Sequence, residues 1–156
     1  MRIFVKHYFK TTKVLTLSSK YAINAVVYLA INSSESQKID IREISKAIDT
    51  PTHYLAKVLQ KLAKAEIISS TKGPNGGFFT TKENLERKVI EIFKVIDGAD
   101  VFSECFLGLK NCNDLRPCPI HHLVKEYKEL VTGDFSKNSI GQYAERIKSG
   151  KMFHRI

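Results

Sequence analysis

Tryptophan is absent from this sequence, cysteine occurs only three times, and no long apolar run is present. None of the apolar stretches approaches the roughly 18 consecutive residues that a membrane-spanning helix needs, so we expect no membrane partner. The N-terminal stretch lacks the continuous apolar segment and the small-residue cleavage site of a signal peptide. These absences predict a cytoplasmic protein with reduced thiols, and an odd number of cysteines argues against a closed disulfide framework.

Enzyme signatures are also missing. The sequence contains no phosphate-binding motif and no pairing of a nucleophile with a base that would indicate catalysis. A redox enzyme or an electron carrier is therefore the least favoured interpretation, and we expect a protein that is not an enzyme.

Positive charge is concentrated in one half of the chain. Residues 1–82 carry 13 Lys and Arg against 5 Asp and Glu, whereas residues 83–156 carry 12 against 11. A basic half suggests a polyanionic partner, because Lys and Arg that neutralise phosphates release condensed counterions. A merely soluble basic surface explains the charge equally well, so the order of the elements has to decide.

The basic half predicts a helix-turn-helix. Residues 19–32 repeat apolar side chains at helical spacing and predict a mostly buried helix. Asp40, as an N-cap with Glu43 completing a capping box, predicts a short helix that ends before Pro51. A basic helix over about 51–65 follows, with an apolar stripe of Tyr54, Leu55, Val58, Leu59 and Leu62.

A β-hairpin is predicted directly after that helix, with strands over 67–71 and 78–80 and a loop rich in glycine and asparagine. This order predicts a mainly α fold, a winged helix-turn-helix domain that binds double-stranded DNA with its second helix in the major groove. A winged helix that binds only proteins is the alternative, against which the charge weighs. The candidate DNA contacts are Thr50 just before the helix, Thr52, His53, Lys57 and Lys61 on it, and Lys72, Gly73 and Asn75 in the wing.

The remainder predicts dimerisation helices. An amphipathic helix over 84–96 leads to Gly98, and residues 120–150 are expected to be helical with a break near 132–134. Their apolar stripes, Leu123, Val124, Tyr127 and Leu130, then Ile140, Tyr143 and Ile147, have little to pack against, which favours a homodimer. We divide the chain into an N-terminal extension (1–14), the DNA-binding domain (15–82), and a cysteine loop with C-terminal dimerisation helices (83–156).

All three cysteines lie in the loop over 103–119. Six residues separate Cys105 from Cys112, and five separate Cys112 from Cys118, a spacing of neither paired zinc-finger motifs nor a ferredoxin. Loop flexibility allows three thiolates to converge, and His121 follows Cys118 by three residues. This donor set suits a soft metal or an iron–sulfur cluster. Redox-reactive thiols without metal are the second interpretation, and chance clustering is the least favoured.

Residues 17–80 resemble the Rrf2 (Rrf-two) family of winged-helix regulators, typified by the iron–sulfur cluster regulator and the nitric-oxide-sensing repressor (IscR/NsrR-like). The resemblance rests on Ser18-Ser-Lys-Tyr-Ala22, Ile41-Arg-Glu-Ile-Ser45, Tyr54-Leu-Ala-Lys-Val-Leu-Gln-Lys-Leu62 and Lys72-Gly-Pro-Asn-Gly-Gly-Phe78. The three-cysteine loop after the fifth helix is similar too. The resemblance implies DNA contacts at positions matching Thr52, His53, Lys57, Lys72 and Gly73.

The same resemblance implies a cluster, 2Fe–2S or 4Fe–4S, that senses iron–sulfur status, oxidants or nitric oxide and that a purified sample can lack. Cys105, Cys112 and Cys118 would hold it, with His121 favoured as the fourth ligand. Three positions depart from the family pattern: the first cysteine gap is six residues rather than five, Lys20 replaces a carboxylate, and Lys72 replaces an arginine. A regulator that responds through thiol oxidation or zinc, without a cluster, is the alternative.

Overall fold

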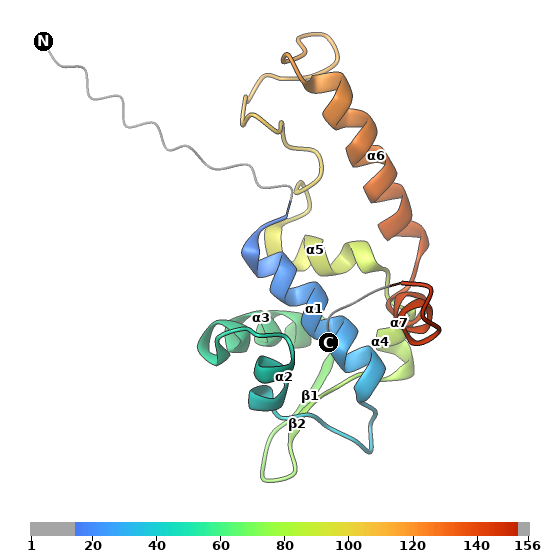
Figure 1. Cartoon of the computed structure of the whole chain (residues 1–156). Coiled ribbons are helices and arrows are strands. Elements are labelled where there is room, and N and C mark those ends of the chain that lie inside the picture. The colour runs from blue at the N-terminus through green and yellow to red at the C-terminus, as the bar shows by residue number, and fades with distance from the viewer. Residues whose placement is uncertain (1–14, 153–156) are drawn as a thin grey trace, which may run out of the picture.

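The computed structural model describes residues 15–152, so the expected extension 1–14 lies outside the described residues. Its elements form a mainly helical fold with one two-stranded antiparallel sheet, which confirms the predicted winged-helix class (Figure 1). They are α1 (Leu17–Asn32), α2 (Ile41–Ala47), α3 (Thr52–Lys64), β1 (Ser69–Thr71), β2 (Gly77–Phe79), α4 (Lys82–Glu86), α5 (Val89–Asp97), α6 (His121–Lys137) and α7 (Ile140–Lys148). Among the described residues, no helix is long and apolar enough to cross a membrane.

Helix α1 forms the centre of the core and contacts α3, α5 and α7. It begins two residues earlier than predicted, because the hydroxyl of Thr16 caps it by accepting a hydrogen bond from the Ser19 amide. Small and branched side chains at helical spacing let the neighbouring helices approach closely. Those that are completely buried are Ala22, Ala25, Val26 and Leu29.

The helix-turn-helix forms much as its sequence predicts. The carboxylate of Asp40 caps α2 by accepting a hydrogen bond of 2.8 Å from the Arg42 amide. The expected capping box is wrong, because the Glu43 carboxylate instead accepts a hydrogen bond of 3.2 Å from the Tyr28 hydroxyl. On α3 the predicted stripe is buried except for Tyr54, which is 47% exposed.

The wing is shorter than predicted. Ile67 and Ile68 are buried in the core, and pairing starts only at Ser69, opposite Phe79. Gly73 adopts a positive φ of 106°, as the turn requires, whereas Asn75 is not among the positive-φ residues. Ile39 forms an isolated bridge to Phe78, which ties the base of the wing to the segment before α2.

Two predicted helix boundaries in the C-terminal part are wrong. The helix expected over 84–96 is split into α4 and α5, because Arg87 and Lys88 are extended and pair with residues 138–140. The break expected at 132–134 does not occur there. Helix α6 runs through Gly133 and ends at Lys137, after which Ser139 caps α7 in a capping box with Gln142.

One hydrophobic core runs through both predicted domains, since Ile92, Ile140 and Ala144 pack in the same cluster as Ala22 and Leu59. The expected boundary between residues 82 and 83 therefore falls inside α4, and residues from both sides of it share one packed core. Helix α7 packs on α1 and α4 of its own chain, so its apolar stripe is covered without a second subunit. Helix α6 differs, because it buries none of its residues and extends away from the core beside the cysteine loop (Figure 1).

Candidate metal centre and nucleic-acid interface

The outward face of α3 displays the predicted helix contacts. Thr52, His53, Lys57 and Lys61 are all exposed, because Leu55, Leu59 and Leu62 turn the opposite face into the core. These side chains lie on the helix that a winged-helix protein inserts into the major groove. They stay predicted contacts.

Thr50 requires a correction, because its side chain is 3% exposed. Its hydroxyl donates to the carbonyl of Ile48 at 3.2 Å, and its carbonyl accepts from the Ser45 hydroxyl at 2.6 Å. Thr50 thus closes the turn between α2 and α3 instead of offering a side chain to DNA. Helical spacing alone did not reveal this, because the residue lies in the turn.

The wing tip exposes Lys72, Gly73 and Asn75. A side chain at Gly76 would place its Cβ 2.2 Å from the carbonyl oxygen of Thr71, so the tight loop requires glycine there. Between the wing and α3 lies a groove of about 610 Å³, whose lining includes Gln60, Lys64, Ser70 and Lys72. The lining contains two lysines, Lys64 from α3 and Lys72 from the wing, together with Asp40.

An aromatic group beside α3 was missed by the sequence analysis. The exposed ring of Tyr54 makes edge-on contacts with Tyr21, at 6.1 Å between ring centroids, and with His53, at 6.0 Å. Helical spacing placed Tyr54 in the buried stripe. Its position at the N-terminal end of α3 turns it outward and adds a hydroxyl to the predicted DNA-binding face.

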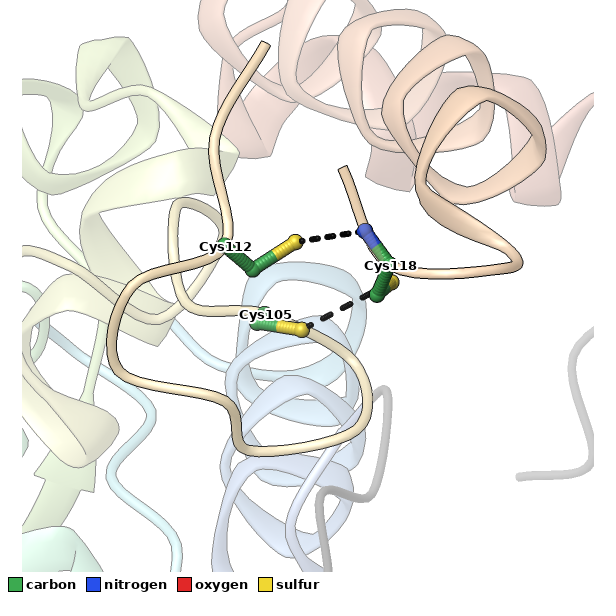
Figure 2. A group of neighbouring side chains, drawn as sticks. All are labelled: Cys105, Cys112 and Cys118. Atoms are coloured by element: carbon green, nitrogen blue, oxygen red, sulfur yellow. Dashed lines mark hydrogen bonds between the residues drawn. The ribbon is translucent and has the colours of Figure 1, made fainter. Parts of the chain in front are cut away.

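The three cysteines converge beside the N-terminal end of α6 (Figure 2). Their sulfur atoms all lie within 4.8 Å of one another, and those of Cys105 and Cys118 are 3.9 Å apart. Cys118 is buried, and its amide donates to the sulfur of Cys112 at 3.4 Å. The loop over 98–120 therefore brings the three sulfur atoms together, as the clustering of the cysteines in the sequence predicted.

The thiols of Cys105 and Cys112 differ in acidity. Burial raises the pKa of Cys105, but hydrogen bonds with the Leu109 and Leu107 amides, followed by those with the Cys112 and Cys118 thiols, together hold that pKa below its ordinary value. Burial, followed by the neighbouring thiols of Cys105 and Cys118, raises the pKa of Cys112. Cys105 is thus the more readily ionised sulfur of the two, and thiolates are the form that ligates metal.

His121, the predicted fourth ligand, contacts this group at Cys112. Its Nδ1 lies 3.1 Å from the Cys112 sulfur, and its Nε2 lies 3.0 Å from a carboxylate oxygen of Asp114. The ammonium group of Lys125 lies 2.9 Å from both carboxylate oxygens of Asp114. Its hydrogen bonds, followed by that from His121, lower the pKa of Asp114.

A cleft of about 460 Å³ opens beside the sulfurs, between the loop and α6. The three cysteines and His121 line one end, and the cleft continues along α6 past Val124 to Gly133. The donor set of three thiols with an adjacent imidazole fits an iron–sulfur cluster or a soft metal ion. The residues present therefore fit the group that the sequence predicts.

The base of the cysteine loop is fastened to α1. The carboxylate of Asp97, the last residue of α5, accepts hydrogen bonds from the Thr16 hydroxyl at 2.7 Å and from the Ser19 hydroxyl at 2.6 Å. Gly98 follows with a φ of 102°, which ends the helix as predicted. Since α1 also packs on α3, these contacts connect the two predicted sites through a single helix.

Sequence comparisons identify related regulators. A family model described as Rrf2, iron-dependent transcriptional regulator, matches residues 15–146. The chain is 32% identical over 123 residues to a protein of Aquifex aeolicus (strain VF5) named as an HTH-type transcriptional regulator, covering 78% of this chain and 84% of that one. It is 27% identical over 128 residues to the HTH-type transcriptional regulator IscR of Klebsiella pneumoniae (strain 342), covering 82% and 77%.

Solved structures with a similar fold include two regulators. CymR of B. subtilis, described as the global cysteine regulator, matches with a TM-score of 0.67 at 18% identity, over 84% of this chain and 95% of that chain. IscR of T. potens matches with a TM-score of 0.66 at 18% identity, over 90% and 92%. At this identity, the likeness shows the fold alone.

Proposed function

Because this chain belongs to the Rrf2 family of transcriptional regulators, we propose that it is a cytoplasmic homodimer that binds specific DNA sequences and responds to an iron–sulfur cluster. The observation that carries the sensing part is the convergence of three thiol sulfurs within 4.8 Å. The segment between α5 and α6, which carries the three cysteines, lies at the opposite end of the molecule from the wing (Figure 1).

The proposed DNA contacts form one surface of α3 and the wing: Thr52, His53, Lys57, Lys61, Lys72, Gly73 and Asn75, to which we add Tyr54. Lysines contribute phosphate contacts, which supply affinity and salt dependence, while Thr52 and His53 near the start of α3 are placed to read base edges. Lys72 binds phosphate as a point charge, without the bidentate geometry of arginine.

Dimerisation is proposed through α6. Leu123, Tyr127 and Leu130 recur at helical spacing on its outer face and are 60%, 48% and 74% exposed. An amphipathic helix that leaves such a stripe uncovered is typical of a symmetric interface. Pairing of α6 would also fix the separation of the two recognition helices and match a palindromic site.

Cys105, Cys112 and Cys118 would hold the cluster, with His121 as the fourth ligand. When bound, the cluster supplies a group that reacts with oxidants and nitric oxide, and whose presence reports iron–sulfur supply. The chain contributes the surroundings: buried Cys118 positions one ligand, and amides of the loop stabilise the Cys105 thiolate. We expect the loop to influence α3 through α1, because Asp97 accepts hydrogen bonds from Thr16 and Ser19 at the start of α1, and α1 packs on α3.

Thiol oxidation without a cluster is the second candidate. The specific observation in its favour is the 3.9 Å separation of the Cys105 and Cys118 sulfurs, which would shorten to about 2.05 Å in a disulfide. A zinc ion would use the same three thiolates.

Anaerobic purification, followed by an absorption spectrum and iron, sulfide and zinc assays on the same sample, separates these candidates. The proposal expects absorption at about 320–460 nm with matching iron and sulfide. Cys112→Ser should abolish it, whereas Asn111→Ser, one residue away, should retain it. Stoichiometric zinc in a colourless sample would support the zinc alternative, and a protein that holds no metal after reconstitution would leave thiol oxidation.

A further inference from the structure

A chain of polar contacts extends outward from the thiols. It runs from the Cys112 sulfur to His121 Nδ1 (3.1 Å), from His121 Nε2 to Asp114 (3.0 Å), and from Asp114 to the Lys125 ammonium (2.9 Å). His121 and Lys125 are four residues apart on α6, so they lie on the same face of the helix. Asp114 comes from the cysteine loop and contacts both side chains.

The chemistry of the carboxylate decides which imidazole nitrogen carries the proton. An ionised carboxylate only accepts hydrogen bonds, so the His121 nitrogen facing Asp114 has to be the donor. A neutral imidazole with its proton on Nε2 leaves the Nδ1 lone pair bare. That nitrogen lies 3.1 Å from the Cys112 sulfur, so in this tautomer it can accept a hydrogen bond from a thiol.

Asp114 is held in place by contacts from its own loop and from α6. The side-chain oxygen of Asn113 accepts hydrogen bonds from the amides of Leu115 and Arg116, at 2.9 and 3.0 Å, and so closes a turn around Asp114. The Lys125 ammonium, at 2.9 Å from each carboxylate oxygen, fixes the orientation of the carboxylate.

We propose that Asp114, held by Lys125, is a positioning residue that fixes the His121 tautomer and presents Nδ1 to the thiol group as a ligand. This assignment deepens the proposed function and rests on it for the identity of the metal group. A carboxylate that hydrogen-bonds the far nitrogen of a ligating histidine orients the ring and strengthens its basicity. The family resemblance pointed to His121 but gave no role to Asp114 or Lys125.

An ordinary surface ion pair between Asp114 and Lys125 is the competing explanation. Exposed pairs contribute little to stability, and the Asp114 side chain is 68% exposed. Such a pair would leave the tautomer of His121 unaffected when it is removed. The tautomer is therefore the readout that separates positioning from a merely structural role.

The test uses full-length, metal-free protein under reducing conditions, with nitrogen-15 NMR of the imidazole at alkaline pH, where the ring is neutral. We expect His121 to carry its proton on Nε2 in the wild type, to become a mixture of tautomers in Asp114→Ala, and to recover in Asp114→Glu. Asp100→Ala, an exposed acidic residue of the same loop, is the control and should change nothing. His122→Ala identifies the neighbouring histidine's signals.

Binding of Co²⁺ provides the second readout, through its thiolate absorption bands. Loss of a carboxylate behind a ligating histidine lowers metal affinity by about 10-fold or more, so Asp114→Ala should weaken Co²⁺ binding by about that factor. In a His121→Ala background the same change should have no further effect. An unchanged tautomer in Asp114→Ala, or equal Co²⁺ affinity, would overturn the assignment. Failure to assemble an iron–sulfur cluster, with both expected results intact, would contradict only the proposed function.

Discussion

The two ends of this molecule are built in opposite ways. At the DNA-facing end, α3 sets Leu55, Leu59 and Leu62 completely into a core shared with α1, and the wing is fastened through Ile39. At the cysteine end, α6 buries no residue and leaves Leu130 at 74% exposure, beside a loop of turns. One chain therefore completes the proposed DNA-binding surface by itself, whereas at the cysteine end the proposed dimer interface on α6 lies open to solvent.

This difference separates the part of the molecule that we expect to keep one shape from the part that we expect to change shape. Close-packed cores transmit strain with little deformation, so α3 and the wing are suited to keep one shape. Elements with few buried apolar contacts change state more easily. Near the C-terminal end of α6, the ring of Phe135 stacks on that of Phe93 on α5, with 4.9 Å between the ring centroids, and this contact joins α6 to the packed core.

The largest effect is expected from a substitution in the proposed dimer interface on α6. Leu130→Asp places a charge in the proposed interface, so the subunits should separate at micromolar concentration. Because linked half-site binding adds about 100-fold or more to affinity, DNA binding should fall by at least that factor. Sedimentation and fluorescence anisotropy measure both. Leu115→Asp, at a loop position 93% exposed, is the control. A dimer that survives Leu130→Asp would place the interface elsewhere.

A smaller effect is expected from replacing single lysines of the proposed DNA-binding surface. Each phosphate contact contributes about 0.9 to the slope of log affinity against log salt, and a symmetric dimer loses two contacts per substitution. Lys57→Ala and Lys72→Ala should each flatten the slope by about two units, whereas Lys148→Ala on α7 should not. Salt titrations at equilibrium provide the measurement. An unchanged slope would remove that lysine from the interface.

The smallest effect is expected on the free energy of unfolding, from relief of backbone strain at one residue near α3. Glu66, in the turn between α3 and β1, has a φ of 58°, which side chains other than glycine and asparagine seldom adopt. Glu66→Gly should raise the free energy of unfolding by about 0.5 kcal/mol, because relief of strain exceeds the added flexibility of glycine. Gln60→Gly, in α3, should lower it by about 1 kcal/mol. Chemical denaturation measures both, and a destabilised Glu66→Gly would contradict the account.

Local signals made the DNA-facing end predictable from sequence. Apolar spacing gave the buried face of α3, Asp40 gave the start of α2, and the glycines gave the wing. The boundary errors arose where distant segments decide. Arg87 and Lys88 break a helix because they pair with residues 138–140, and the turn of the helix-turn-helix buries Thr50.

The candidate metal centre was predictable in its ligands but not in its surroundings. Three cysteines in one loop predicted convergence, and their sulfurs do converge. The contacts of Asp114 with His121 and Lys125 depend on how the loop folds back on α6, which no local pattern indicates. The same holds for Asp97, whose partners Thr16 and Ser19 lie about 80 residues earlier in the chain.

Communication between the two ends is the central claim, and one titration tests it most directly. A DNA site is selected from a random-sequence pool with the purified protein, and its affinity is then measured by anisotropy for the cluster-loaded and metal-free forms at one salt concentration. The account predicts affinities that differ by about 5-fold to 150-fold, the usual range of coupling between sites. Equal affinities, with the cluster shown by its absorption to be present in one sample and absent from the other, would contradict it.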